Sequence, residues 1–171
     1  MRVSSFLIAL LGAGSACAEV RDSSAAGFTV ENTATVPVDP MSAWKALVEG
    51  IDNWWPRDHT WWGTASTLSI EARAGGCFCE IAGDRQAAHM QVAFTDPGKL
   101  LRLIGGLGPL QGMGLHGVME WRFEPLDAGT RITLYYRAGG YTTDDLTKFA
   151  PIVDSVQAQQ LGGLAEHVRR R

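Results

Sequence analysis

Two neighbouring segments near the C-terminal end of the chain alternate between apolar and polar residues with a period of two. The apolar positions are Met119, Trp121, Phe123, Ile132, Leu134 and Tyr136. Successive side chains of a strand point to opposite faces, so each segment has one apolar face and one polar face. This pattern is typical of antiparallel strands in a sheet that is covered on one side only. The chain must therefore supply something to cover that side.

The rest of the chain supplies more strands and two helices. A long helical segment over 144–168, in which Pro151 suits a first-turn position, is the expected cover. Asp39 and Pro40 predict the start of a shorter helix, and Gly50 predicts its end. The other expected strands are 28–36, 67–73, 77–81, 88–95 and 100–104. The predicted fold is α+β: a curved antiparallel sheet wrapped around a long C-terminal helix, with a short helix after the first strand.

Several short stretches accompany this order of elements. They are WWPRDHT at 54–60, GGCFCE at 75–80, GLGPLQ at 106–111, GGY at 139–141 and PIVD at 151–154. With them, residues 28–168 resemble the START-like or SRPBCC superfamily, which has the helix-grip fold of the birch-pollen allergen. The likeness is to a bacterial branch of polyketide-cyclase-like or ATPase-activator-like proteins. It implies an apolar cavity between sheet and helix, but members carry lipids, bind hormones, cyclise polyketides or activate an ATPase, so it implies no single chemistry.

The first 18 residues have the pattern of a secretory signal peptide. Arg2 precedes an apolar run at 6–11, and residues 16–18 (ACA) form a small-residue cleavage site. We expect cleavage after Ala18, export, and from the family resemblance a periplasmic location. A lipoprotein anchored through Cys17 is the less favoured alternative. Residues 19–27 are small and polar and predict a disordered lead-in, so that 28–171 form a single domain.

Charge and motifs exclude several classes of function. The net charge is −3, and the one basic cluster is 169–171 at the C-terminus, which argues against nucleic-acid binding. No apolar run after residue 18 is long enough to span a membrane. The string at 112–117 matches GxGxxG, but a strand rather than a helix follows it, so no dinucleotide site is expected. We therefore expect no cofactor, no resident metal and no membrane span, and we expect the glycine-rich 105–117 to be a loop near the cavity. The sequence leaves the oligomeric state open.

Four tryptophans lie within nine residues. They are Trp54, Trp55, Trp61 and Trp62. Such a cluster is expected either at the rim of a cavity or, for some of its members, in the core. His59 lies inside the cluster beside Asp58, which suits either a general base or a structural histidine.

Cys77 and Cys79 are two residues apart on an expected strand and so share one face. A hairpin turn centred on 84–85 would set Cys79 opposite Met90, on an apolar and therefore inward face. We expect two buried thiols. The alternatives are a redox-active disulfide across about 6.6 Å of strand and a metal site.

The same register places Glu80 opposite His89 on the outer face of the sheet. An exposed pair of this kind contributes little to stability. If the faces were reversed, Glu80 and His89 would be the best candidates for acid–base chemistry in the chain.

The sequence favours an exported protein that binds a small hydrophobic or amphipathic molecule. The expected ligand-binding residues are Trp54, Trp55, His59, Cys77, Cys79, Met90, Met119, Trp121 and Tyr136. An enzyme of the cyclase, aromatase or hydratase kind is the alternative, with His59 and Tyr136, and the Glu80 and His89 pair, as candidate groups. A protein-interaction module is a further alternative, although a signal peptide would separate it from a cytosolic ATPase.

Overall fold

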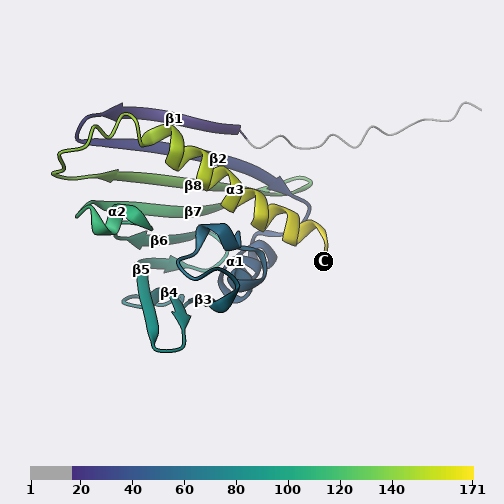
Figure 1. Ribbon diagram of the computed structural model, residues 1–171. Coiled ribbons are helices and arrows are strands. Elements are labelled where there is room, and N and C mark those ends of the chain that lie inside the picture. The colour runs from purple at the N-terminus through teal and green to yellow at the C-terminus, as the bar shows by residue number, and fades with distance from the viewer. Residues whose placement is uncertain (1–16) are drawn as a thin grey trace, which may run out of the picture.

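A computed structural model describes residues 17–171, and its main feature is one curved antiparallel sheet of eight strands. The strands are β1 (Cys17–Ser24), β2 (Gly27–Val36), β3 (Thr67–Ile70), β4 (Cys77–Ala82), β5 (Arg85–Asp96), β6 (Leu100–Ile104), β7 (His116–Leu126) and β8 (Gly129–Gly139). Their order across the sheet is β1-β2-β8-β7-β6-β5-β4-β3, as Figure 1 shows. The expected signal peptide lies outside the described residues except for its last two positions.

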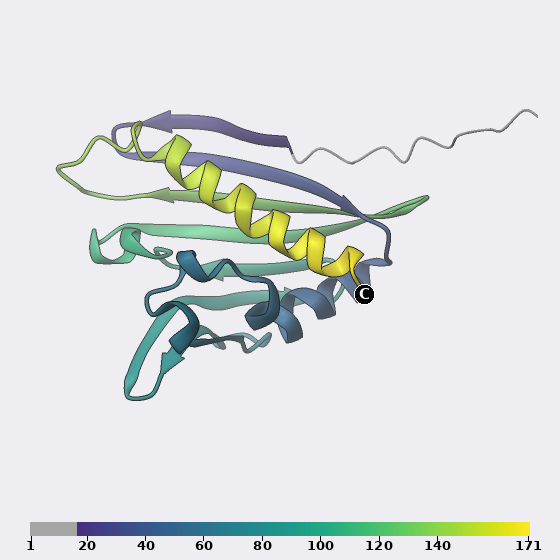
Figure 2. The ribbon, with the colours of Figure 1, turned by 45° about the vertical axis from the view of Figure 1, so that its right-hand side comes forward.

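Helices cover one face of this sheet. They are α1 (Pro40–Trp54), α2 (Pro109–Gly112) and α3 (Ala150–Arg169), with short 3-10 turns η1 (Arg57–His59) and η2 (Gly63–Ala65). Helix α3 runs diagonally across the sheet from the β1 side toward α1 (Figure 2). The expected α+β class, with a curved antiparallel sheet and a C-terminal helix, is confirmed. Within 17–171, no helix combines the length and the apolar character that a membrane crossing needs.

The alternation in β7 and β8 places the apolar residues on the inward face of the sheet, as predicted. All six apolar positions are buried, and Trp121 and Tyr136 are among the largest fully buried side chains. Trp44 of α1 packs edge-on against Phe123, and Trp54 packs edge-on against Trp121, with ring centroids 5.8 and 6.0 Å apart. The core therefore forms between the sheet and α1 together with the C-terminal part of α3.

The N-terminal segment differs from the expectation of a disordered lead-in. Residues 19–24 lie within β1, which pairs with β2, so two strands rather than one precede α1. Val20 pairs with Val30, and Arg21 forms an ion pair with Glu31 at 2.8 Å. Edge strands are often short and charged, so a polar composition does not prevent backbone pairing there.

Helix α1 begins as predicted and ends later than predicted. The carboxylate of Asp39 accepts hydrogen bonds from the backbone N–H groups of Met41 and Ser42 at 2.9 and 3.0 Å, which caps the helix. The helix continues past Gly50 to Trp54, because Ile51 and Trp54 extend its buried face. Gly50 is buried against α3, so a glycine at this position serves close packing of the two helices and does not end α1.

The predicted register of β4 and β5 is wrong. The turn is centred on residues 83–84, with Gly83 at φ +64°. As a result, the side chain of Ala82 points inward and that of Ile81 points outward. A β-bulge then shifts the pairing, and Cys79 lies opposite Ala88 while Phe78 lies opposite Met90. A shift of one residue in the register moves every side chain of a strand to the opposite face of the sheet. Phe78 and Glu80 consequently point inward, and the cysteines lie on the outer side.

The two glycines near the middle of α3 have different surroundings, which gives a prediction. A Cβ at Gly162 meets no atom within 4 Å, whereas a Cβ at Gly163 falls 2.6 Å from the backbone oxygen of Trp54. We expect Gly162→Ala to raise the free energy of unfolding by about 0.5–1 kcal/mol through helix propensity. We expect Gly163→Ala to lower it by about 1–3 kcal/mol, because α3 must move away from α1. Urea denaturation of both variants measures the difference, and equal effects would contradict the close approach of the two helices.

Candidate functional site

A largely apolar pocket of about 360 Å³ lies between α3, the aromatic segment after α1 (residues 55–62) and the loop before α2 (residues 105–108). Its lining residues are Trp55, Asp58, His59, Thr60, Trp61, His89, Leu107, Gly108, Pro109, Leu110, Tyr136, Phe149, Ile152, Val153, Val156, Gln157 and Gln160. This volume is at the lower end of the range for small-molecule sites. The N-terminal half of α3 forms one wall, while its C-terminal half packs on the core.

The α3 wall contains polar groups that have no protein partner. Seven buried side-chain atoms lack a hydrogen-bond partner among the described residues, and four of them belong to pocket residues. They are Nδ1 of His59, both polar side-chain atoms of Gln157, and Oε1 of Gln160. A buried polar group without a partner costs about 1–3 kcal/mol. These groups are therefore suited to hydrogen bonding with a molecule in the pocket.

The four clustered tryptophans divide between the pocket and structural packing. Trp55 and Trp61 line the pocket, and Trp61 is half exposed. Trp54 is a core residue whose indole N–H donates to the backbone oxygen of Ala46 at 3.0 Å. Trp62 lies beneath the guanidinium of Arg85, 5.4 Å from the ring centroid. Trp55 and Trp61 therefore line the pocket and Trp54 lies in the core, whereas Trp62 is half-buried and belongs to neither.

Glu80 and His89 form a buried pair beside the pocket. Nε2 of His89 lies 2.9 Å from Oε2 of Glu80, and His89 is 6% exposed. The carboxylate also accepts the backbone N–H groups of Trp61 and Trp62 at 3.0 and 3.1 Å. His89 lines the pocket, whereas Glu80 lies behind it and is fully buried. The pair is thus on the inner side of the sheet, and not on the outer face where the sequence register placed it.

The protonation states of this pair follow from burial and hydrogen bonding. Burial lowers the pKa of His89 below its ordinary 6.5, and the hydrogen bond and charge of Glu80 offset this only in part. Burial raises the pKa of Glu80, but Ser66, the two tryptophan amides and His89 together bring it below 4.5. At neutral pH the pair is therefore a carboxylate hydrogen-bonded to a neutral imidazole.

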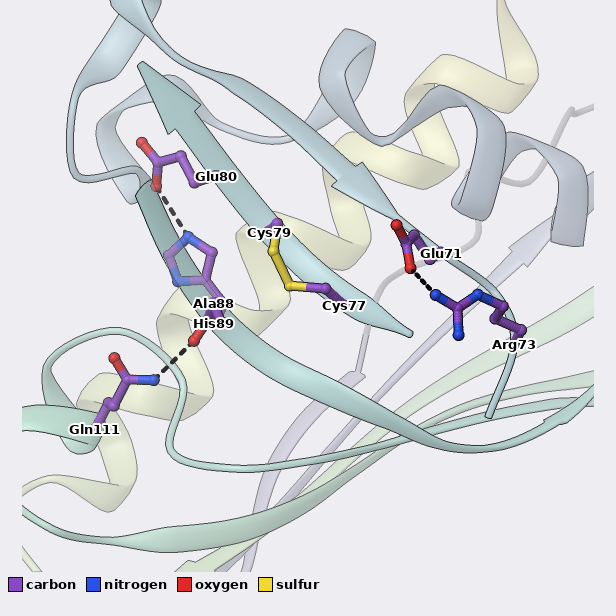
Figure 3. The surroundings of a disulfide bond; sticks show 8 residues. All are labelled: Glu71, Arg73, Cys77, Cys79, Glu80, Ala88, His89 and Gln111. Atoms are coloured by element: carbon purple, nitrogen blue, oxygen red, sulfur yellow. Dashed lines mark hydrogen bonds and ion pairs between the residues drawn. A yellow bond between two sulfur atoms is a disulfide. The ribbon is translucent and has the colours of Figure 1, made fainter. Parts of the chain in front are cut away.

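Cys77 and Cys79 form a disulfide and do not line the pocket. Figure 3 shows this bridge on β4, with Glu80 and His89 alongside. The expectation of two buried, inward-facing thiols is wrong because of the register described above. Among residues 17–171, no group of three or more His, Cys, Asp or Glu side chains is arranged to hold a metal.

Of the remaining predicted site residues, three lie in the core and one lines the pocket. Met90, Met119 and Trp121 are buried in the core and are not in the lining of the pocket. Tyr136 lines the pocket, and its hydroxyl accepts the N–H of Leu107 at 3.2 Å and donates to the backbone oxygen of Gly105 at 3.3 Å. Burial raises the pKa of Tyr136 to about 12, so it stays protonated and anchors the loop.

Sequence reasoning did not identify Gln157 and Gln160 as pocket residues. They follow Val153 and Val156 at helical spacing and so lie on the apolar face of α3. Two amides on an otherwise apolar and buried helix face are the signal that could have revealed them, because buried polar side chains need partners. Leu107 and Phe149 come from irregular segments, where no periodic pattern exists.

Comparison with known proteins shows the fold and no more. No family model matches the chain, and no curated protein matches it in sequence. Protein MLL2253 from Mesorhizobium loti superimposes with a TM-score of 0.62 at 17% identity, covering 83% of this chain and 97% of that one. CalU16 from Micromonospora echinospora gives 0.57 at 14%, covering 92% and 85%. DynU16, a protein of the dynemicin biosynthetic locus, gives 0.58 at 15%, covering 82% of this chain and 46% of that one. The chain thus has a fold found in these bacterial proteins.

The state of His89 predicts a pH dependence of stability. The unfolded chain takes up a proton on this imidazole near pH 6.5, whereas the folded chain resists it because its pKa is lower. The free energy of unfolding should therefore fall as the pH drops from 7.5 to 5.5, by at most about 1.4 kcal/mol per pH unit for this one proton. His89→Gln should make the slope shallower, measured by urea denaturation at several pH values. His116→Gln, at an exposed position, is the control, and the same slope in wild type and His89→Gln would contradict the buried neutral imidazole.

Proposed function

We propose that this chain binds a small, neutral and mostly apolar molecule in the pocket beside α3. The observation that carries the proposal is the combination of an apolar pocket with buried polar atoms that have no partner, namely both side-chain polar atoms of Gln157 and Oε1 of Gln160. Ligand sites typically have this composition: apolar walls and a few fixed polar groups that orient the ligand. A ligand with one or two hydrogen-bonding groups on a hydrocarbon frame matches it.

The charges around the pocket narrow the ligand class. No lysine or arginine is among its lining residues, and the one acidic residue there, Asp58, is exposed. A buried anion needs a cationic partner or several hydrogen-bond donors. The pocket therefore favours a neutral compound, such as a ketone or an amide, over a free fatty acid. An amphipathic lipid with an anionic head group is not favoured.

We further propose membership in the START-like or SRPBCC superfamily. The curved sheet with its C-terminal helix supports it, as do the structural likeness to CalU16 and DynU16 and the stretches at 54–60 and 106–111. A second candidate function within this fold is an enzyme of the polyketide cyclase or hydratase kind. The buried pair of Glu80 and His89 beside the pocket favours it.

Export remains part of the proposal. The signal-peptide pattern at 1–18 supports it, and the disulfide of Cys77 and Cys79 suits an oxidising compartment such as the periplasm. Cleavage after Ala18 would leave β1 paired with β2 from residue 19 onward. The mass of the protein recovered from the periplasmic fraction of its host should correspond to a chain starting at Glu19. A full-length mass in the cytosol would contradict export.

Filling the pocket should abolish binding. Val156 is half-buried on the α3 wall, and Val156→Trp places an indole in the ligand's space. We expect the affinity for the neutral fluorescent probe N-phenyl-1-naphthylamine to fall at least about tenfold, since the probe must displace a packed ring. Fluorescence titration measures this. Val118→Trp, the same change on an exposed strand position, is the matched control, and unaltered binding by Val156→Trp would place the probe elsewhere.

Gln157 should contribute to binding and reduce stability. Its side chain is fully buried and neither of its polar atoms has a partner, so Gln157→Leu should raise the free energy of unfolding by about 1–3 kcal/mol. The same change should weaken binding of 2-tetralone, a neutral bicyclic ketone, because its carbonyl loses a hydrogen-bond donor. Urea denaturation and quenching of tryptophan fluorescence measure the two effects.

Gln159→Leu is the matched control for this prediction, because Gln159 is the exposed glutamine of the same helix. It should leave both the stability and the affinity close to those of the wild type. A Gln157→Leu variant that is less stable than the wild type would show that the amide has structural partners.

A further inference from the structure

We propose that His89, oriented by Glu80, is a general base that removes a proton from the carbon next to the carbonyl group of a ketone bound in this pocket. The proposal rests on the ligand pocket described above and names a reaction and a substrate class for it. The pocket, the strand geometry and the partners of the carboxylate each support it.

A β-bulge turns the imidazole toward the pocket. Along β5 the residues alternate until the pairing shifts between Phe78 and Cys79, where His89 is the extra residue of β5. His89 and Met90 are therefore buried in succession, although neighbours on a regular strand point to opposite faces. Bulges are frequent beside active sites, where they redirect a side chain. The regular pairing of β5 with β4 is interrupted at this point, and the imidazole of His89 lies in the pocket wall as a result.

Glu80 has the position that an orienting carboxylate needs. It accepts Nε2–H of His89 and two backbone amides, so both of its oxygens are fixed, and it does not line the pocket itself. Holding the proton on Nε2 leaves Nδ1 unprotonated, and among the described residues Nδ1 has no hydrogen-bond partner. This is the arrangement in which a carboxylate sets the tautomer of a histidine base and stabilises the imidazolium that forms.

The proton transfer balances without any co-reactant. The C–H bond next to the carbonyl breaks, its proton moves to Nδ1, and its electron pair moves into the carbonyl group to give an enolate. Glu80 stabilises the resulting imidazolium, and the Nε2 proton stays where it is. Return of the proton from Nδ1 to carbon restores both the ketone and the neutral imidazole.

The opposite wall offers a donor for the enolate oxygen. Nε2 of Gln157 is buried and unpartnered, and amide donors in a dry site stabilise developing oxyanions. The other candidate bases are less suitable. The Tyr136 hydroxyl is hydrogen-bonded to the loop on both its donor and its acceptor side, and His59 forms no hydrogen bond with Asp58.

Deuterium exchange into 2-tetralone tests the proposal. The full chain is incubated with the ketone in D2O, and proton NMR follows loss of the signal at the carbon between ring and carbonyl. We expect the wild-type protein to accelerate exchange over buffer and His89→Gln to lower the protein-dependent rate about 10²-fold. Quenching of tryptophan fluorescence should show that His89→Gln still binds the ketone. His116→Gln should exchange at the wild-type rate.

Glu80 is a positioning residue, so its test needs a readout that lost packing alone would not change. Glu80→Gln should lower the exchange rate and alter its pH profile, because the imidazolium loses its ionised partner. Nitrogen-15 NMR of the wild-type protein should show His89 protonated on Nε2 and not on Nδ1. The opposite tautomer at neutral pH would overturn the proposal irrespective of any substrate.

The outcomes separate this proposal from the one on which it rests. Binding of 2-tetralone with equal exchange in wild type and His89→Gln overturns the general base and leaves the ligand pocket intact. Absence of ketone binding overturns both.

Discussion

The buried carboxylate of Glu80 is the point at which the pocket is assembled. It receives two backbone amides from the aromatic segment after α1 and one imidazole N–H from β5, while it belongs to β4 itself. The carboxylate thus joins the aromatic segment, which is not part of the strand pairing there, to the paired strands β4 and β5. An ionised carboxylate buried in this way must be satisfied by donors, so the geometry of those donors is strongly constrained. Trp61 and His89 reach the pocket from the segments that this carboxylate joins.

The interior has two parts with different packing. At one end, the C-terminal half of α3 and helix α1 press tryptophans against the sheet, and Trp54, Trp121 and Phe123 fill the space. Gly163 lets the two helices approach there. At the other end, α3 presents Val153 and Val156 together with two amides, and the space is left to the pocket. A helix that grips the sheet closely at one end can therefore leave room for a small molecule at the other.

The sequence allowed prediction of the elements that have a local signal, and of little that depends on the register between strands. Alternation over 119–136 identified the inward face of β7 and β8, and Asp39 identified the start of α1, because both signals are local in the sequence. The faces of β4 were misassigned, since one bulge and one turn residue reverse them without changing the composition. That error moved the cysteines inward and Glu80 outward. Three of the nine predicted ligand residues, Trp55, His59 and Tyr136, line the pocket, whereas Trp54, Met90, Met119 and Trp121 are inward-facing residues of the core. Gln157 and Gln160 were visible in the sequence as polar interruptions of an apolar helix face.

The decisive experiment is a crystal structure of the protein grown with 2-tetralone. We expect the ketone between α3 and the aromatic segment, with its carbonyl oxygen within hydrogen-bond distance of the Gln157 amide and a ring-side carbon facing His89. A pocket closed by inward rotation of its own side chains, with the ketone absent or bound elsewhere on the surface, would contradict this expectation.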